Sequence, residues 1–135
     1  MPVIGTQQSP IQIVTSNAIT ISKPEELFRI EYEDRVYHGV FAPAPPGHGN
    51  FELDTAPYPK VFFKSKSDAY VYELRRIHIH LKSEHLIDSM VQRDYEVHLL
   101  HVRQGMTLTD PKLVIGILYH ESFEIPSGRG LERFN

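Results

Sequence analysis

The sequence predicts a mainly β protein with an antiparallel or mixed twisted sheet and few short helices. Several stretches alternate apolar and polar residues with a period of two, as 27–34 and 70–81 do, and this period is typical of half-buried strands. No stretch has the apolar spacing of an amphipathic helix, and heptads and repeats are absent. Prolines and glycines separate the alternating stretches, as they do at turns between short strands.

Composition predicts one globular domain over residues 1–135. Hydrophobic residues make up 41% of the chain and charged residues 23%, which excludes a disordered chain. A net charge of −3 without a long basic run predicts no nucleic-acid surface. The chain has no cysteine, so disulfides, thiolate metal ligands and a cysteine nucleophile are excluded.

The N-terminal residues, MPVIGTQQSP, lack the basic and apolar regions of a signal peptide. No stretch is long and apolar enough to span a bilayer, so no membrane partner is expected. As written, the chain is expected to be cytoplasmic. A mature secreted or periplasmic protein whose signal had been removed would have the same sequence.

Strands are expected over seven stretches, namely 11–21, 27–34, 36–42, 51–54, 61–63, 70–81 and 112–123. The last of these, KLVIGILYHESF, is a nearly continuous run of β-forming residues and is expected to be a central buried strand. Residues 42–50, rich in proline and glycine, are expected to form a loop. The connection 81–92 has room for one helical turn.

Residues 76–102 contain a histidine pattern that predicts a metal-binding β-hairpin. In an extended strand His78 and His80 lie on one face. If a second strand carrying His98 pairs with the first in the right register, three imidazoles converge on that face. Three imidazoles with an open fourth position are the ligand set of a catalytic zinc site.

Glu96 shares the predicted face of His98, and a carboxylate commonly holds the second N–H of a ligating imidazole. Zinc is the favoured ion, although imidazole also suits copper, iron and nickel. The alternative is that the histidines occupy a solvent-exposed strand face without binding metal. His101 faces away from them and is expected to be a buried structural histidine, whereas His85 could serve either role.

The spacing His78-x-His80-x3-Glu84 also fits the first half of the cupin metal motif. The glycines before the first histidine and the Pro-x-Gly before the last, which cupins have, are absent. The 18 residues from His80 to His98 are also few for a cupin, so this family fits less well.

Six segments, in the same order along the chain, resemble segments of the α-class carbonic anhydrases. They are QSPI (8–11), GHGNFE (47–52), YELRRIHIH (72–80), SEH (83–85), EVHLLH (96–101) and VIGI (114–117). The resemblance covers nearly the whole chain but only about the first half of a full family domain. It implies a twisted sheet like the N-terminal half of the carbonic anhydrase fold.

The resemblance assigns a role to each candidate site residue. His78, His80 and His98 would bind Zn²⁺, and Glu96 would orient His98. Glu84 would be the catalytic carboxylate that, in the family, accepts a hydrogen bond from a threonine hydroxyl.

Three further residues match the substrate side of the family site. His48 would be the proton shuttle, a role that the near-neutral pKa of histidine suits. Leu100 and Val114 would form the apolar wall where carbon dioxide docks. The implied reaction is the reversible hydration of carbon dioxide to bicarbonate by a zinc-bound hydroxide.

The sequence also departs from the family pattern. The threonine that partners the carboxylate belongs to the family's second half, and Thr107, Thr109 and Ser122 are the candidate replacements. Arg76 stands where the family has a glutamine that accepts a hydrogen bond from the first ligand, and a guanidinium has no acceptor. Leu81 replaces a tryptophan.

The expected function is therefore a zinc-dependent, carbonic-anhydrase-like protein with impaired hydration activity. One alternative is a non-catalytic module that binds metal or a ligand, and another is a zinc hydrolase for a different, bulkier substrate. A sheet that ends where half a domain ends would expose an edge and an apolar face, so a homodimer is expected.

Overall fold

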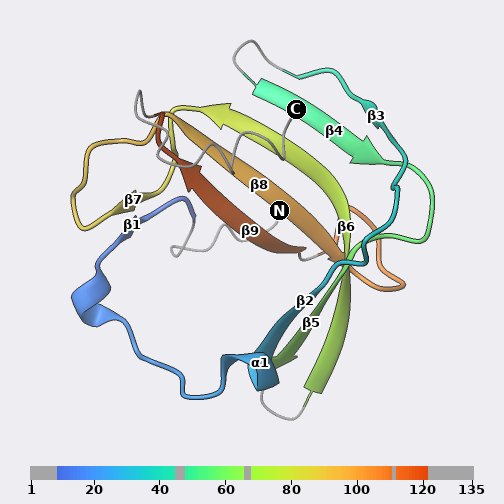
Figure 1. Cartoon of the computed structure of the whole chain (residues 1–135), viewed down its shortest axis with the longest axis horizontal. Helices are drawn as coiled ribbons and strands as arrows, with labels where there is room; N and C mark the ends of the chain where they lie inside the picture. The colour runs from blue at the N-terminus through green and yellow to red at the C-terminus, as the bar shows by residue number, and fades with distance from the viewer. Residues whose placement is uncertain (1–8, 45–47, 66–67, 111, 122–135) are drawn as a thin grey trace, which may run out of the picture.

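The computed structural model describes residues 9–44, 48–65, 68–110 and 112–121, with the side chain of residue 65 excepted. Seven of the described strands form one sheet, and a separate pair of very short strands lies beside it. Figure 1 shows that the large sheet is curled. The large sheet consists of β2 (Phe28–Glu31), β3 (Gly39–Phe41), β4 (His48–Leu53), β5 (Lys60–Ser65), β6 (Asp68–Leu81), β8 (Tyr95–Arg103) and β9 (Lys112–Tyr119). The predicted mainly β, antiparallel fold is confirmed.

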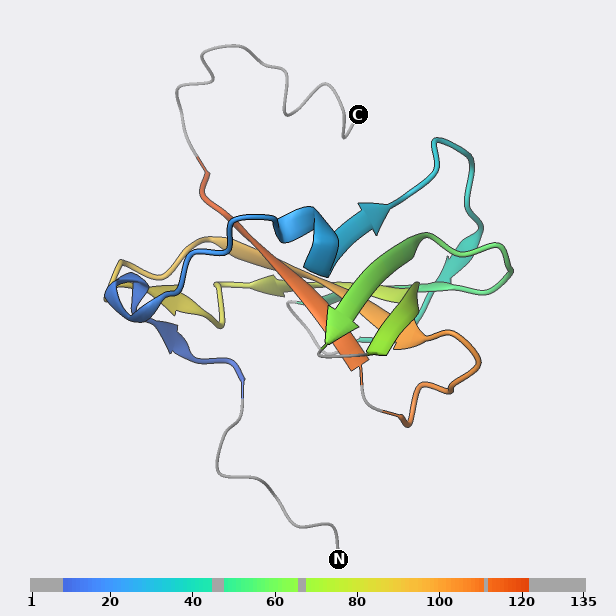
Figure 2. The same cartoon turned by 90° about the horizontal axis from the view of Figure 1, so that it is seen from below.

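The small elements lie in the N-terminal arm and in the connection between β6 and β8. The parallel pair joins β1 (Gln12–Ile13) to β7 (Leu86–Ile87), and a 3-10 turn, η1 (Thr15–Asn17), follows β1. The one α-helix of the described residues, α1 (Pro24–Leu27), is a single turn that begins at a proline, whose fixed φ suits a first helical position. No helix of the described residues is long and apolar enough to cross a membrane. Figures 1 and 2 both place the arm with β1 and η1 on the β7 side, away from β3 and β4.

Strand β6 organises the sheet. Its first half pairs with β5 and its second half pairs with β4, while β8 runs along the other edge of β6. The register of β6 and β8 shifts between Leu74 and Arg76, and such an irregularity bends a strand. All these pairings are antiparallel. Because β6 has partner strands along both edges, it brings residues from distant parts of the chain onto one surface.

One row of the register crosses the candidate site. His78 on β6 lies opposite Asn50 on β4 and opposite His98 on β8, and His98 lies opposite Gly116 on β9. Because paired residues share a face, the side chains of this row lie on one side of the sheet.

The apolar core of the described residues is small. It contains five buried apolar side chains, namely Leu53, Val61, Leu74, Leu100 and Val102. On the face opposite the histidines, Ile79 remains 40% exposed and Ile117 37% exposed. Buried polar groups are concentrated at the site itself, where Ser83, Glu96 and His98 are all buried.

The expectation that 112–123 forms a central buried strand is wrong. Within the described part of the chain β9 pairs with β8 alone, so it is an edge strand, and Val114 is 48% exposed. The strand ends at Tyr119, and residues 122 and 123 lie outside the described residues. Apolar composition indicated a strand but not whether both of its edges are paired.

Three other boundaries also differ. Of the short strands expected over 11–21, only β1 forms, because η1 and extended backbone follow it. Residues 48–50 of the loop expected over 42–50 belong to β4. The connection 81–92 holds β7 instead of a helical turn, and Asp88 and Ser89 have the positive φ angles of a tight turn, 49° and 56°.

Candidate metal centre

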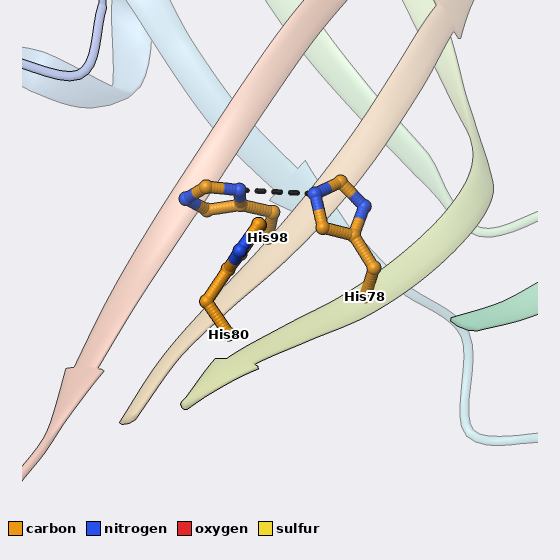
Figure 3. A group of neighbouring side chains, drawn as sticks. All are labelled: His78, His80 and His98. Carbon is orange, nitrogen blue, oxygen red and sulfur yellow. Dashed lines mark hydrogen bonds between the residues drawn. The ribbon is translucent and has the colours of Figure 1, made fainter. Parts of the chain in front are cut away.

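Three imidazoles converge on one face of the sheet, as Figure 3 shows. His78 and His80 project from β6 two residues apart, and His98 projects from β8 directly across from His78. One nitrogen from each ring lies within 4.8 Å of the others, and the ring centroids are 4.7 to 4.9 Å apart. This convergence is the one that strand periodicity predicted, and such a cluster can hold a metal ion.

The contacts of the rings indicate which nitrogens face the centre. Nδ1 of His98 lies 3.1 Å from Nε2 of His78, while Nε2 of His98 lies 2.8 Å from a carboxylate oxygen of Glu96. Nε2 of His80 is buried and has no hydrogen-bond partner among the described residues. A buried nitrogen without a partner is costly unless something binds it, so this atom fits a metal ligand.

The surroundings keep the rings of His78 and His80 neutral. Burial, together with the charges of His98, His80 and Arg76, lowers the pKa of His78 from 6.5 to about 4, against an opposing effect of Glu84. Burial likewise lowers the pKa of His80. Only a neutral imidazole has a lone pair for a metal, so both rings are in the protonation state that metal binding needs.

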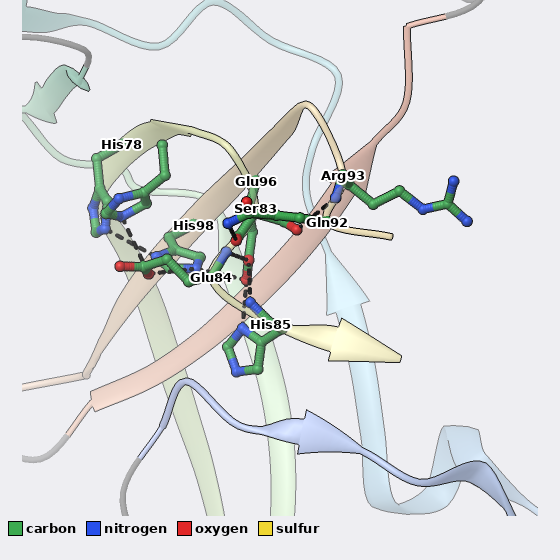
Figure 4. Close-up of polar contacts among 9 residues, drawn as sticks. His78, Ser83, Glu84, His85, Gln92, Arg93, Glu96 and His98 are labelled. Carbon is green, nitrogen blue, oxygen red and sulfur yellow. Dashed lines mark hydrogen bonds and ion pairs between the residues drawn. The ribbon is translucent and has the colours of Figure 1, made fainter. Parts of the chain in front are cut away.

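Glu96 is fully buried behind His98 and accepts hydrogen bonds from several directions (Figure 4). The backbone N–H groups of Glu84 and His85 donate to Oε2 at 2.7 and 2.8 Å. Oε1 lies 2.5 Å from Nδ1 of His85 and 2.8 Å from Nε2 of His98. Burial raises the pKa of Glu96, but these hydrogen bonds outweigh it and hold the pKa at about 2. Glu96 is therefore a carboxylate that fixes the ring of His98.

The backbone amides that hold Glu96 come from a tightly closed loop between β6 and β8. Ser83 is buried, and its hydroxyl accepts a hydrogen bond from the backbone N–H of Arg93 at 2.8 Å. The backbone N–H of Ser83 donates to the carbonyl of Arg93, and the side chain of Gln92 donates to the carbonyl of Ser83. These bonds fix the loop just before Glu84 and His85, so both amides point at Glu96.

Gly116 provides the space for this carboxylate. It lies opposite His98, and a Cβ at this position would lie 3.1 Å from Oε1 of Glu96. Glu96 has little freedom to move away because four donors surround it. A glycine is therefore required here for packing, not for an unusual backbone angle.

Glu84 contacts the cluster with its side chain. One carboxylate oxygen lies 3.5 Å from Nε2 of His80 and 3.7 Å from Nε2 of His98. The structure does not bring the candidate hydroxyls to it. Thr107 and Thr109 bond to each other and, through Thr107, to Asp110 in the turn between β8 and β9, while Ser122 lies outside the described residues.

The residues expected on the substrate side also lie near the cluster. His48 opens β4 opposite His80, and their ring centroids are 4.8 Å apart. Leu100 is buried on the face of His98, two residues further along β8. Val114 lies opposite Leu100 on β9.

A cavity of about 360 Å³ opens beside the cluster. Val114 lines it, whereas Leu100 is not among its lining residues. Its other walls are Ser9, Pro10, Ile13, Glu84, His85, Glu96, His98, Gly116 and Leu118. The N-terminal arm, β8 and β9 therefore enclose a mainly apolar space that reaches Glu96 and His98.

Two site residues were missed by sequence reasoning. The sequence does not decide the role of His85, yet its ring contacts Glu96. No sequence pattern assigns a role to Asn50, although it lies opposite His78 and its Oδ1 is buried without a hydrogen-bond partner among the described residues. The alternation of His48, Asn50 and Glu52 was the available signal, because β4 places all three on the face of the histidines.

Arg76 does not serve as the missing acceptor for His78. Its guanidinium donates to Glu52 from Nε and Nη2, at 3.1 and 2.8 Å.

His101 is the buried structural histidine that was expected. It is fully buried, with Nε2 2.6 Å from the hydroxyl of Tyr32 and Nδ1 3.2 Å from the carbonyl of Leu113.

No protein-family model matches the chain, and no curated protein matches it. Solved structures do. Dioscorin, in a crystal structure with ascorbate, is 24% identical with a TM-score of 0.61 and is matched over 96% of this chain and 48% of its own. The α-carbonic anhydrase of Thermovibrio ammonificans, in complex with the inhibitor sulfanilamide, is 20% identical with a TM-score of 0.64, over 90% of this chain and 47% of its own. A halotolerant carbonic anhydrase from Dunaliella salina is 19% identical with a TM-score of 0.62, and the match covers 89% of this chain and 48% of its own.

At these identities the likeness establishes the fold. The chain spans about half the length of each of these solved structures. The resemblance read from the six sequence segments is therefore confirmed as a structural match. The chain has the fold of about half of an α-carbonic anhydrase.

Proposed function

We propose that this chain is a carbonic-anhydrase-like zinc protein in which His78, His80 and His98 bind the ion. The observation that carries the proposal is the convergence of three imidazoles, one of them with a buried nitrogen that has no hydrogen-bond partner among the described residues. When bound at such a site, zinc acts as a Lewis acid and lowers the pKa of a coordinated water to about 7. The proposed activity is the hydration of carbon dioxide.

Two carboxylates beside the proposed ligands have separate roles. Glu96 fixes His98 so that Nδ1 faces the centre, since Nε2 is held by the carboxylate. The carboxylate of Glu84 lies against His80 and His98 and offsets positive charge there. In this proposal Glu84 would also accept a hydrogen bond from the attacking water, whereas its counterpart in the family does so through a threonine.

Asn50 is proposed to hold His78. A ligating Nε2 leaves the hydrogen of the ring on Nδ1, where it requires an acceptor. Asn50 is the residue of the neighbouring strand β4 that pairs with His78, and its buried Oδ1 has no hydrogen-bond partner among the described residues. Asn50 would accept the hydrogen bond that the glutamine accepts in the family. Arg76, which stands in place of that glutamine, donates to Glu52 instead.

The cavity beside His98 provides the place for the substrate. Its apolar walls, with Val114 among them, suit carbon dioxide, which has no hydrogen to donate. His48, exposed beside His80, is the proposed carrier of the released proton to solvent.

A second candidate is a non-catalytic module that binds metal or a small ligand. The observation that favours it is the absence of a hydroxyl bonded to Glu84 among the described residues, since efficient hydration in the family depends on that contact. The cavity is also larger than carbon dioxide requires, which suits a bulkier ligand or a bulkier electrophile. The structure of dioscorin with ascorbate is a complex of this fold with a small organic molecule.

The test is a stopped-flow assay of carbon dioxide hydration on protein whose zinc content has been measured, beside the variant His98→Ala. We expect hydration in proportion to bound zinc, and its loss in the variant. Bound zinc without hydration would support the binding module. Hydrolysis of an activated ester without hydration of carbon dioxide would instead favour a hydrolase.

A further inference from the structure

We propose that the chain has a second metal-ion site, formed by His85, Glu96 and His98, in which the ring of His98 bridges two ions. This site lies behind the three-histidine centre and takes a divalent cation that prefers nitrogen and carboxylate ligands, such as Zn²⁺ or Cu²⁺. It goes beyond the proposed function, because it depends on neither the hydration reaction nor its substrate.

The donor atoms of this second set are already gathered. Nδ1 of His85, a carboxylate oxygen of Glu96 and a nitrogen of His98 all lie within 4.8 Å of one another. Oε1 of Glu96 is 2.5 Å from the first and 2.8 Å from Nε2 of His98. Tetrahedral ligands at about 2.0 to 2.2 Å from an ion lie roughly 3.3 to 3.6 Å apart, so Oε1 and each of the two nitrogens need to separate by about 0.5 to 1 Å.

The two oxygens of Glu96 have different roles. Two backbone N–H groups hold Oε2 in place, and they would continue to hold it with an ion bound. Oε1 is contacted by the two imidazoles, and an ion can replace those hydrogens. The carboxylate is therefore a fixed ligand with one oxygen directed at both rings.

His98 offers a different nitrogen to each centre. Nδ1 faces His78 and the three-histidine cluster, whereas Nε2 faces Glu96. When an ion binds at the second site, His85 would carry its ring proton on Nε2 in place of Nδ1, and Nε2 of His98 would lose its proton to solvent, leaving the electron pair to bind the ion. Both nitrogens of His98 then bind ions, and the ring is a bridging imidazolate.

The cavity gives the second site its own entrance. His85, Glu96 and His98 line the cavity, whereas His78 and His80 do not. Gly116 lines it too, and the missing Cβ leaves room beside Oε1 that a side chain would fill. An ion can therefore reach Oε1 without passing through the three-histidine centre.

The first test is the zinc retained per chain after gel filtration, measured by elemental analysis. The wild type is expected to keep two ions, and His85→Asn, which retains a hydrogen-bond donor beside Glu96, is expected to keep one. His78→Ala is also expected to keep one, because the second site lacks that residue. His120→Ala is the matched control, since His120 is an exposed histidine 3.2 Å from a carboxylate oxygen of Asp94, and it is expected to keep two.

One ion in the wild type, or two in His85→Asn, would overturn the proposal. A copper-loaded wild type provides a measurement that needs no variant. Two Cu²⁺ ions joined by an imidazolate are antiferromagnetically coupled, so the electron paramagnetic resonance signal should integrate to far less than two spins at low temperature. A signal of two independent spins would contradict the bridge.

Discussion

At the scale of single residues, Glu96 connects the proposed metal ligands to the backbone. Its four hydrogen bonds join His98 to His85 and to the loop that Ser83 closes. Because the carboxylate is buried and anionic, any loss of charge or position there is transmitted to the ring of His98. The zinc affinity of the three-histidine site therefore depends on Glu96, although Glu96 is not one of the three ligands.

Replacing Glu96 with glutamine tests this dependence. The amide keeps the size of the side chain but removes the negative charge, so zinc affinity at the three-histidine site should fall by about 10- to 100-fold. A competition titration with a chelating dye measures the change. Glu121→Gln, at an exposed position, should leave the affinity unchanged. Equal affinities in the Glu96 variant and the wild type would show that His98 does not need this partner.

The low pKa of His78 predicts how stability depends on pH in metal-free protein. Its pKa is about 4 in the folded chain, against an ordinary value of 6.5. Between these values the unfolded chain binds more protons than the folded chain, so the free energy of unfolding should fall as the pH falls from about 6.5 to about 4. Glu96 acts in the same direction at lower pH, since its pKa of about 2 lies below the ordinary 4.5.

Urea denaturation of the metal-free protein at several pH values measures this dependence. His78→Gln should be less sensitive to pH in the window between about 4 and 6.5, because the group that titrates there is gone. An identical pH dependence in the variant and the wild type would refute the low pKa of His78.

The convergence of His78, His80 and His98 was predictable from the sequence, because strand periodicity is local and each pair of alternating residues shares a face. His85 and Asn50 were not predictable in the same way. Their roles depend on a loop closure and on the register of β4 against β6, and neither is encoded in a local pattern.

At the scale of secondary structure elements, β9 supports the site from the side of Glu96. Its composition predicted a strand, but composition gives no information on whether neighbours flank both edges. The strand positions Gly116 against the carboxylate, so a packing requirement in β9 is also a requirement of the metal site.

Gly116→Ala tests that requirement. The new methyl group would lie 3.1 Å from Oε1 of Glu96, and overpacking of this kind costs about 1 to 3 kcal/mol. We expect a lower free energy of unfolding and weaker zinc binding. Gly49→Ala on β4 is the matched control, because a Cβ there would meet no atom within 4 Å. If the two variants behave alike, Gly116 does not limit the site.

The N-terminal arm is held beside the site by Asp88. Its carboxylate accepts hydrogen bonds from the backbone N–H and the hydroxyl of Thr15, and these bonds lower the pKa of Asp88. Asp88→Ala should release the arm and increase amide hydrogen exchange over residues 12–17. Asp110→Ala removes an equivalent pair of bonds, to Thr107, in another turn, and should leave exchange in the arm unchanged. Unchanged exchange in the Asp88 variant would mean that β1 and β7 hold the arm by themselves.

At the scale of the whole molecule, the sheet is covered unevenly. The histidine face carries buried polar groups, while the opposite face leaves Ile79 and Ile117 well exposed. Strand β9 also has one edge that no described strand pairs. The sequence predicted the fold class and its relation to the carbonic anhydrases, because the segment order and the ligand spacing extend along most of the chain. It could not predict what covers this face.

We propose that a second copy of the chain covers it, as a symmetric dimer. Sedimentation equilibrium at micromolar concentration should then give twice the mass of the chain. Ile79→Lys places a charge in the apolar face and should shift the protein towards monomer, whereas Val36→Lys, outside the sheet and 78% exposed, should not. A monomeric wild type would contradict this arrangement.

Anomalous X-ray diffraction from a zinc-loaded crystal is the decisive measurement for the three-histidine metal site. We expect an anomalous peak about 2.0 to 2.1 Å from Nε2 of His78, Nε2 of His80 and Nδ1 of His98, and its absence in His98→Ala crystals. A fully loaded crystal with no peak between these three nitrogens would contradict it.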